Sequence, residues 1–190
     1  LTLYPSVQVS GTVTLDGQPQ ANIPIGFFSY LREAYAQTDS SGSYVITMPV
    51  DDYTAYATVI KGNASYVAMA NVPGGTETVD LDIVLDPGAV VTGYINGTSG
   101  PVADATAIFT AESGAHIKTP ANAQGQYRVV LPTGTYTVYA WGAGRSYWDE
   151  KVISGSSSVD IALGDSGYIY GQVWTDKNGN GQRDSGEGLG

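Results

Sequence analysis

The sequence predicts an all-β protein made of tandem β-sandwiches, and three observations lead to this prediction. The 190 residues include 25 Gly and 14 Tyr, together with many Thr and Val, a composition typical of short strands joined by tight turns. Apolar and polar residues alternate over many short segments, as in half-buried strands. The same series of strands and turns then occurs twice along the chain, which indicates a repeat architecture.

The repeat is clearest around a Gly-x-Tyr motif and extends over about 80 residues, which holds about seven short strands in a sandwich. Three segments of the first copy match segments of the second: 42–57 with 125–140, 7–14 with 89–96, and "VDLDIVL" (79–85) with "VDIAL" (159–163). The pattern begins a third time with "GYIYGQVW" at 167–174. We therefore expect one sandwich at 1–85, a second at 86–164, and the first strand and loop of an incomplete third at 165–190.

Turn signals separate the expected strands in the order in which the chain meets them. "LDGQP" (15–19) and "NGTSGP" (96–101) predict hairpin turns, in which glycine supplies the positive φ. "DSSG" (39–42) and "NAQG" (122–125) predict turns that lead into the Gly-x-Tyr strand. The stretch "YLREAYAQ" (30–37) has a helix-like composition but is too short to form a stable helix alone.

These motifs together resemble the carboxypeptidase regulatory-like family of transthyretin-like, Ig-like sandwiches, which is related to the B-type repeats of collagen adhesins. The resemblance covers about 160 residues and implies seven-stranded sandwiches. In the second copy, Asn122 replaces the usual acidic residue of the turn, and we expect this to change only a turn hydrogen bond. The matching residues are Gly11, Val13, Gly17, Thr38, Asp39, Gly42, Tyr44, Pro49 and Tyr53, and then Gly93, Gly125, Tyr127, Pro132, Gly134, Tyr136 and Val138.

The C-terminal sequence "DKNGNGQRDSGE" (176–187) follows the pattern D-x-[DN]-x-[DN]-G-x5-E of an EF-hand-type calcium loop. Calcium takes hard oxygen ligands, and Gly181 permits the sharp bend that lets them surround the ion. This region resembles the first strand and calcium loop of the B-domains of serine-aspartate repeat surface proteins. The expected ligands are the side chains of Asp176, Asn178, Asn180, Asp184 and Glu187 and, as the resemblance implies, the backbone carbonyl of Gln182.

Composition and charge exclude several classes of function. With 18 Asp and Glu against 8 Lys and Arg the net charge is −10, so the chain offers no basic stripe for nucleic acid. No apolar run reaches the roughly 20 residues that span a bilayer. Cysteine is absent, which excludes disulfides and thiolate sites. The chain begins with Leu1 rather than Met and shows no signal peptide, so we expect a processed product or a piece of a longer protein.

Catalytic machinery is not expected. His116 is the only histidine, so a zinc site or a Ser/His/Asp triad lacks its partners, and we expect this residue at the surface or rim. The acids available for paired-carboxylate chemistry fall in predicted turns and loops. They are Glu33, Asp51, Asp52, Glu112, Asp149 and Glu150.

Two further groups of residues are candidates for binding or modification. Trp141, Tyr147 and Trp148 are able to stack on sugar rings if exposed, although we favour the interpretation that the two tryptophans pack across a hairpin. Asn63 in "NAS" and Asn96 in "NGT" fit the N-glycosylation rule and lie in predicted loops.

The sequence therefore predicts a non-enzymatic spacer or stalk segment of an extracellular or cell-surface protein, stiffened by Ca²⁺. Expected partners are neighbouring domains of the same or adjacent chains, with glycans or cell-surface proteins as alternatives; nucleic acid and membrane insertion are not expected. Two other readings stay open. One is a carbohydrate-binding module, and the other is a filament or surface-layer subunit that adds strand 167–174 to a neighbouring sheet.

Overall fold

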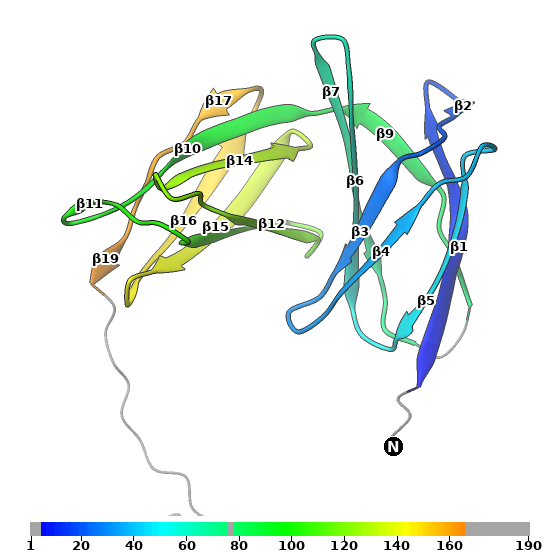
Figure 1. Cartoon of the computed structure of the whole chain (residues 1–190), viewed down its shortest axis with the longest axis horizontal. Helices are drawn as coiled ribbons and strands as arrows, with labels where there is room; N and C mark the ends of the chain where they lie inside the picture. The colour runs from blue at the N-terminus through cyan, green and yellow to red at the C-terminus, as the bar shows by residue number, and fades with distance from the viewer. Residues whose placement is uncertain (1–4, 76–77, 166–190) are drawn as a thin grey trace, which may run out of the picture.

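The computed structural model of the chain describes residues 5–75 and 78–165. All regular elements in these ranges are strands, β1 to β19, which confirms the predicted all-β fold class. The strands form two sandwiches, β1–β9 and β10–β19, that lie next to each other in Figure 1. No helix in the described ranges has the length and hydrophobicity needed to cross a membrane.

In the first sandwich, β1 belongs to one layer and pairs with β5 on one side and with β8 and β9 on the other. The second layer has the order β7-β6-β3-β4, and β9 connects the two layers by pairing with β7. The strands are β1 (Ser6–Leu15), β2 (Gln18–Pro19), β3 (Pro24–Phe28), β4 (Glu33–Gln37), β5 (Ser43–Pro49), β6 (Tyr53–Lys61), β7 (Ala64–Val72), β8 (Val79–Asp80) and β9 (Ile83–Pro87).

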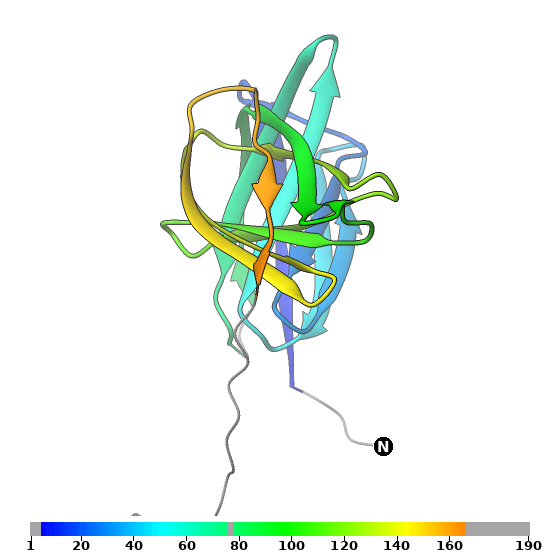
Figure 2. The same ribbon diagram turned by 90° about the vertical axis from the view of Figure 1, so that its left-hand side faces the viewer.

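The second sandwich, which faces the viewer in Figure 2, repeats this arrangement with β10 in the place of β1. One layer holds β14, β10, β17 and β18, and the other has the order β13-β12-β15-β16-β19. The strands are β10 (Ala89–Gly97), β11 (Gly100–Pro101), β12 (Thr106–Ala111), β13 (His116–Pro120), β14 (Gln126–Leu131), β15 (Gly134–Gly142), β16 (Arg145–Ile153), β17 (Ser157–Ser158), β18 (Ile161–Ala162) and β19 (Gly164–Asp165).

Each sandwich encloses its own hydrophobic core, because one face of each long strand is apolar. In β10, for example, Val91 and Ile95 are fully buried while the intervening Thr92 and Tyr94 are exposed. A phenylalanine on the third strand packs beside the tyrosine of the Gly-x-Tyr motif in both cores. The ring centroids lie 6.1 Å apart for Phe27 and Tyr44 and 5.9 Å apart for Phe109 and Tyr127.

The glycine of the first strand and the motif tyrosine act together on one backbone carbonyl. The Tyr44 hydroxyl donates to the Leu81 carbonyl oxygen at 2.7 Å, and a Cβ on Gly11 would lie only 2.0 Å from that oxygen. In the second sandwich Tyr127 donates to Val159 O at 2.6 Å. Gly93 makes the equally close approach there. In each sandwich the last strand can lie against the first strand only because Gly11 and Gly93 carry no side chain.

The same contacts refine the repeat. Asp82 Oδ1 accepts the Thr12 N–H at 2.8 Å and Asp160 Oδ1 accepts the Tyr94 N–H at 2.9 Å, so these two aspartates are counterparts. Within the matched segment 79–85, residues 81–85 are therefore the ones that correspond to 159–163. The hydrogen bonds from the Thr12 hydroxyl and from the Thr12 N–H lower the pKa of Asp82 below its usual value.

The predicted turns are confirmed. Asp16 and Gly17 both have positive φ in the turn between β1 and β2. Asn122 Oδ1 accepts the N–H groups of residues 124 and 126, as Asp39 Oδ1 accepts those of 41 and 43. The acid-to-amide change therefore keeps the turn, as expected. The helix-like stretch 30–37 forms β4 and the turn before it. The exact limits of the predicted units stay a prediction.

Candidate functional site

The two sandwiches meet along the outer face of β6 and β7, which packs against β13 and the ends of β12 and β14 (Figure 1). At the centre, Thr54 Oγ1 accepts the backbone N–H of His116 at 2.9 Å and lies 3.4 Å from its Nδ1. Thr54 is 1% exposed and His116 is 7% exposed. His116 is therefore buried between the sandwiches, and the expectation that it lies at the surface was wrong.

Two further hydrogen bonds join the sandwiches. The Tyr56 hydroxyl donates to Val130 O at 2.9 Å, and Asn71 Nδ2 donates to Ser113 O at 2.6 Å. Burial raises the pKa of Tyr56 to about 12. We call this contact the seam; it comprises Thr54, Tyr56, Met69 and Asn71 of the first sandwich and Ser113, His116 and Val130 of the second.

Apolar packing accompanies these polar contacts. Phe28, Tyr56 and Met69 belong to the first sandwich but pack against the hydrophobic core of the second. The Tyr30 ring, on the β3–β4 turn, stacks on His116 with centroids 4.8 Å apart and planes 17° apart. The seam thus combines a continuous apolar contact with buried polar groups that have partners, as stable interfaces do.

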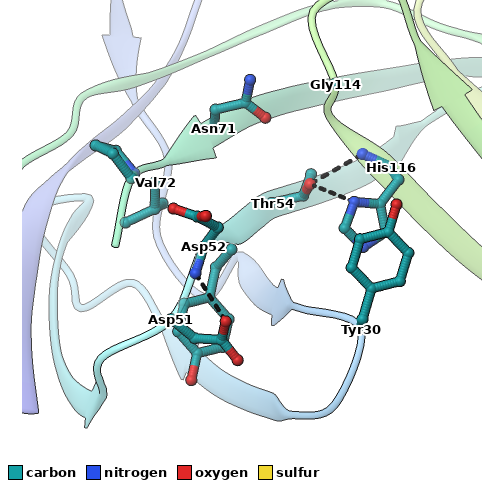
Figure 3. A pocket seen from close by; sticks show the side chains of 10 residues that line it. Tyr30, Asp51, Asp52, Thr54, Asn71, Val72, Gly114 and His116 are labelled. Atoms are coloured by element: carbon teal, nitrogen blue, oxygen red, sulfur yellow. Dashed lines mark hydrogen bonds between the residues drawn. The ribbon is translucent and has the colours of Figure 1, made fainter. Parts of the chain in front are cut away.

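A cavity of about 380 Å³ lies beside the Tyr30–His116 stack (Figure 3). Its acidic residues are engaged with their own sandwich: Asp52 Oδ1 accepts the Gly74 N–H at 2.6 Å, and Asp51 Oδ2 accepts the Ser29 hydroxyl at 2.8 Å. These carboxylates hold loops in place and are not poised as an acid and base pair.

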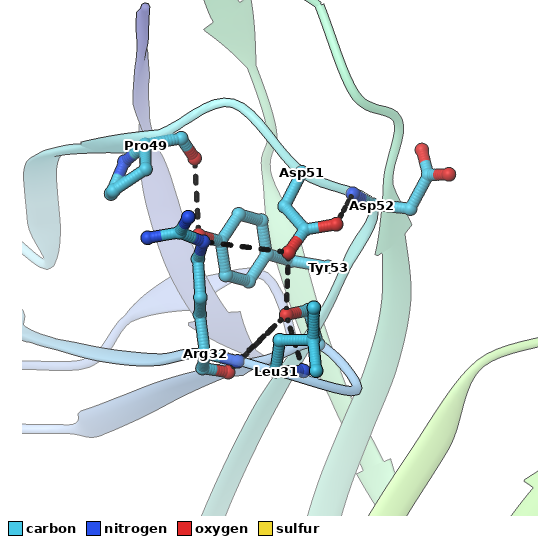
Figure 4. A network of polar contacts seen from close by, with 7 residues as sticks. Leu31, Arg32, Pro49, Asp51, Asp52 and Tyr53 are labelled. Atoms are coloured by element: carbon cyan, nitrogen blue, oxygen red, sulfur yellow. Dashed lines mark hydrogen bonds and ion pairs between the residues drawn. The ribbon is translucent and has the colours of Figure 1, made fainter. Parts of the chain in front are cut away.

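Asp51 also belongs to a polar network that fixes the β3–β4 turn (Figure 4). Arg32 Nε lies 3.9 Å from Asp51 Oδ2, and the Ser29 hydroxyl accepts the N–H of Arg32 at 3.0 Å. Next to it, the Tyr53 hydroxyl donates to Pro49 O at 3.0 Å. Tyr136 and Pro132 make the same contact in the second sandwich at 2.9 Å. The network therefore positions Tyr30 over His116.

The other predicted acids are dispersed. Glu33 lies on β4, and Asp149 and Glu150 lie on β16, so these three occupy strands rather than the expected loops. Lys151 Nζ lies 2.6 Å from Asp149 Oδ2, which together with the Tyr147 hydroxyl lowers the pKa of that carboxyl. Among the described residues no three His, Asp or Glu side chains gather as a metal site.

The three predicted sugar-stacking residues do not form one platform. Trp141 lies on β15, whereas Tyr147 and Trp148 are adjacent on β16 and therefore face opposite sides of the sheet. Tyr147 packs against the core, while Trp148 is 69% exposed and lies opposite Tyr139. The Tyr139 ring stacks on Trp141, with centroids 5.5 Å apart. Tyr139 and Trp148 are exposed, whereas Trp141 is half-buried and lines a cavity with Phe28 and Tyr30 of the first sandwich. We call Tyr139, Trp141 and Trp148 the aromatic face.

The predicted glycosylation sites and calcium ligands lie in different parts of the chain. Asn63 is exposed at the turn between β6 and β7, as expected for a glycosylation acceptor. Asn96 was expected in a loop, but it is half-buried in β10 and pairs with Pro101 and Ala162. The predicted calcium ligands lie outside the described residues, and they are Asp176, Asn178, Asn180, Gln182, Asp184 and Glu187.

The seam residues were missed from sequence, although β6 carried a signal. Tyr53, Ala55 and Ala57 face the core, and the intervening Thr54 and Tyr56 are uncharged rather than solvated. A strand whose two faces both lack charge is expected to be covered on both sides. That pattern indicates a second contact but does not identify His116 as the partner.

No family model matches the sequence, and no curated protein matches it. Among solved structures, the chain is similar to the shaft pilin SpaA from Lactobacillus rhamnosus GG, with 10% identity and a TM-score of 0.37 over 88% of this chain and 100% of that one. It is similar to the Bacillus anthracis TIE protein, with 15% identity and a TM-score of 0.34 over 83% of this chain and 33% of that one.

A third similar structure is a streptococcal ancillary pilin, with 15% identity and a TM-score of 0.32 over 85% of this chain and 63% of that one. The chain thus spans only part of the length of this pilin and of the TIE protein. At such low TM-scores these likenesses carry no argument about function.

Proposed function

We propose that this chain is a non-enzymatic structural spacer of an extracellular or cell-surface multidomain protein, which holds its neighbouring domains at a fixed separation. The seam is the observation that carries the proposal. Strand β9 ends at Pro87 and β10 begins at Ala89, so a single residue connects the sandwiches. Gly88 itself is enclosed by Val67 and Val130. A connection this short, with buried hydrogen bonds beside it, resists bending far better than a flexible linker.

We further propose that the sandwiches are related to the carboxypeptidase regulatory-like family. The motif residues that carry this resemblance have structural tasks in both copies, which supports the relationship. Gly11 admits the last strand, Tyr44 binds its carbonyl, and Tyr53 binds the Pro49 carbonyl.

Calcium is the proposed ligand of the C-terminal loop, and the donor set supports this. Three carboxylates, from Asp176, Asp184 and Glu187, two amide oxygens and one carbonyl supply the hard oxygens that calcium prefers. A loop with two amides among its ligands is expected to bind with a Kd of roughly 10⁻⁴–10⁻³ M, as extracellular modules do. Calcium would then fix the turn that follows the second sandwich.

A distance measurement across the seam tests the spacer function. The chain contains no cysteine, so Gln8→Cys and Ser99→Cys introduce a unique pair of spin labels at exposed positions of the two sandwiches. We expect one narrow distance distribution by electron paramagnetic resonance, unchanged by dilution. A broad or multimodal distribution in the unaltered background would show that the sandwiches move independently, and the proposal would then be wrong.

A further inference from the structure

The aromatic face occupies the same place on the second sandwich as the seam occupies on the first. Tyr53 and Tyr136 are counterparts, because each donates to a proline carbonyl four residues earlier. Three residues further on, Tyr56 and Tyr139 therefore correspond. The cross-strand partner of Tyr56 is Met69, and that of Tyr139 is Trp148.

The two faces differ in what covers them. On the first sandwich, Tyr56 and Met69 pack against the core of the second sandwich. On the second sandwich, the corresponding Tyr139 and Trp148 are 43% and 69% exposed. An exposed Tyr and an exposed Trp side by side on neighbouring strands leave a large aromatic surface in water, and such clusters mark docking surfaces.

The chain leaves the second sandwich at this face in the way that it leaves the first. Asp86 at the end of β9 pairs with Val67 of β7, and Asp165 at the end of β19 pairs with Arg145 of β16. The Arg145 and Asp165 side chains also form an ion pair. After β9, the last strand of the first sandwich, β10 follows directly and opens the second sandwich. In the sequence, 167–174 likewise follows Asp165 and repeats the opening of β10.

We propose that the aromatic face is the docking surface for the next sandwich of the chain, the one that residues 167–174 open. This inference rests on the proposed spacer function and extends it: successive sandwiches dock through the same face. Trp148 takes the position of Met69 and supplies a larger apolar contact at the centre, where tryptophan contributes most to interfaces.

One difference between the seam and the aromatic face indicates which chemical groups the docking sandwich must present. Asn71 donates its Nδ2 hydrogen to Ser113 O across the seam, and its counterpart on β16 is Glu150, since Thr54 pairs with Asn71 and Thr137 with Glu150. A carboxylate only accepts hydrogen bonds. The docking sandwich must therefore present a donor, a backbone N–H or a basic side chain, where the second sandwich presents a carbonyl.

Quenching of tryptophan fluorescence, in a chain that is extended by a third sandwich, tests the proposal. Residues 1–174 are joined to a second copy of residues 97–165, which completes the third sandwich, and every tryptophan except the original Trp148 is changed to Phe. Glu150→Asn is added, because the copied Ser113 presents a carbonyl and needs the donor that Asn71 supplies in the seam. We expect acrylamide quenching of Trp148 to be about threefold weaker than in the 190-residue chain with the same substitutions, because docking excludes water from the centre of an interface. As a matched control, Tyr94→Lys on the other layer is expected to leave the shielding intact, whereas Tyr139→Lys is expected to abolish it.

A folded third sandwich that leaves Trp148 as exposed as before would overturn the docking. So would shielding of Trp148 in the 190-residue chain by cello- or chito-oligosaccharides without shielding by the added sandwich, which would assign the face to glycans. The spin-label distance between Gln8 and Ser99 reports only on the existing seam, so the docking can fail while the spacer function stands.

A second variant tests the docking proposal without the added strands, in case these strands do not fold. Met69→Trp in the 190-residue chain, with its three natural tryptophans changed to Phe, places the proposed docking residue in the existing seam. We expect this tryptophan to be shielded from acrylamide and the Gln8–Ser99 distance to be unchanged. An exposed tryptophan or a broadened distance would show that a face with Trp at this position does not accept a sandwich, which would overturn the proposal.

Discussion

The contact of a bare glycine with a backbone carbonyl is the most demanding single-residue feature of each sandwich. Leu81 O would lie 2.0 Å from a Cβ on Gly11, and Val159 O equally close to one on Gly93. The obstacle is backbone, which cannot turn aside as a side chain can. The Tyr44 and Tyr127 hydroxyls hold these carbonyls in place from the other side.

Gly11→Ala should therefore destabilise the first sandwich by about 2–3 kcal/mol, the cost of overpacking a site that cannot relax. Chemical denaturation of the whole chain measures this. Gly155→Ala is the matched control, because nothing lies within 4 Å of a Cβ at that position, and it should change the free energy of unfolding by little. Equal effects of the two substitutions would contradict the clash.

Buried tyrosines make the fold sensitive to alkali. Burial raises the pKa of Tyr56 and of Tyr136 to about 12 from the ordinary tyrosine value of 10.0, and it raises the pKa of Tyr44 and of Tyr127 further. Since the unfolded chain then loses protons at a lower pH than the folded chain, stability is full below pH 10 and falls as pH rises towards 12. Urea titrations across this range should show the fall, and Tyr56→Phe should make it shallower. An unchanged slope in that variant would argue against burial of Tyr56.

At the scale of strands, β6 is the element that joins the sandwiches, because both of its faces are covered. Thr54→Val should leave the buried N–H of His116 without an acceptor, at a cost of about 1–3 kcal/mol. We expect one cooperative thermal transition in the unaltered chain to separate into two. Thr58→Val, on the same face of β6 but outside the seam, should keep a single transition.

Strands and turns were predictable because their signals are local. The positive-φ pair Asp16–Gly17 and the Asx turns at Asp39 and Asn122 follow from residues within a few positions. The period of two also implies that the adjacent Tyr147 and Trp148 face opposite sides of the sheet, and that Tyr139 faces the same side as Trp141. The seam was not predictable, since Thr54 and His116 are 62 residues apart, and their contact depends on how two complete sandwiches pack.

At the scale of the whole molecule, calcium is expected to act at the end of the second sandwich. Calcium at a tenfold excess over Kd should stabilise the chain by about 1.4 kcal/mol. We expect this stabilisation as a higher melting temperature, or as a more ordered C-terminal segment, in millimolar calcium than in chelator. Asp184→Ala removes one carboxylate ligand and should abolish the difference. A calcium response that survives this substitution, or no response in the unaltered chain, would remove the proposed calcium site.

The parallel pairing of first and last strands determines how each sandwich responds to force. Val9 pairs with Val79 and Val13 with Ile83, so β1 enters at one end of this ladder and β9 leaves at the other. Val91 and Ile95 pair in the same way with Ser157 and Ile161. Tension between the chain ends therefore shears these hydrogen bonds together instead of peeling them one at a time. A row of such sandwiches would lengthen in abrupt steps under load, one sandwich per step, and would carry tension almost undeformed between them.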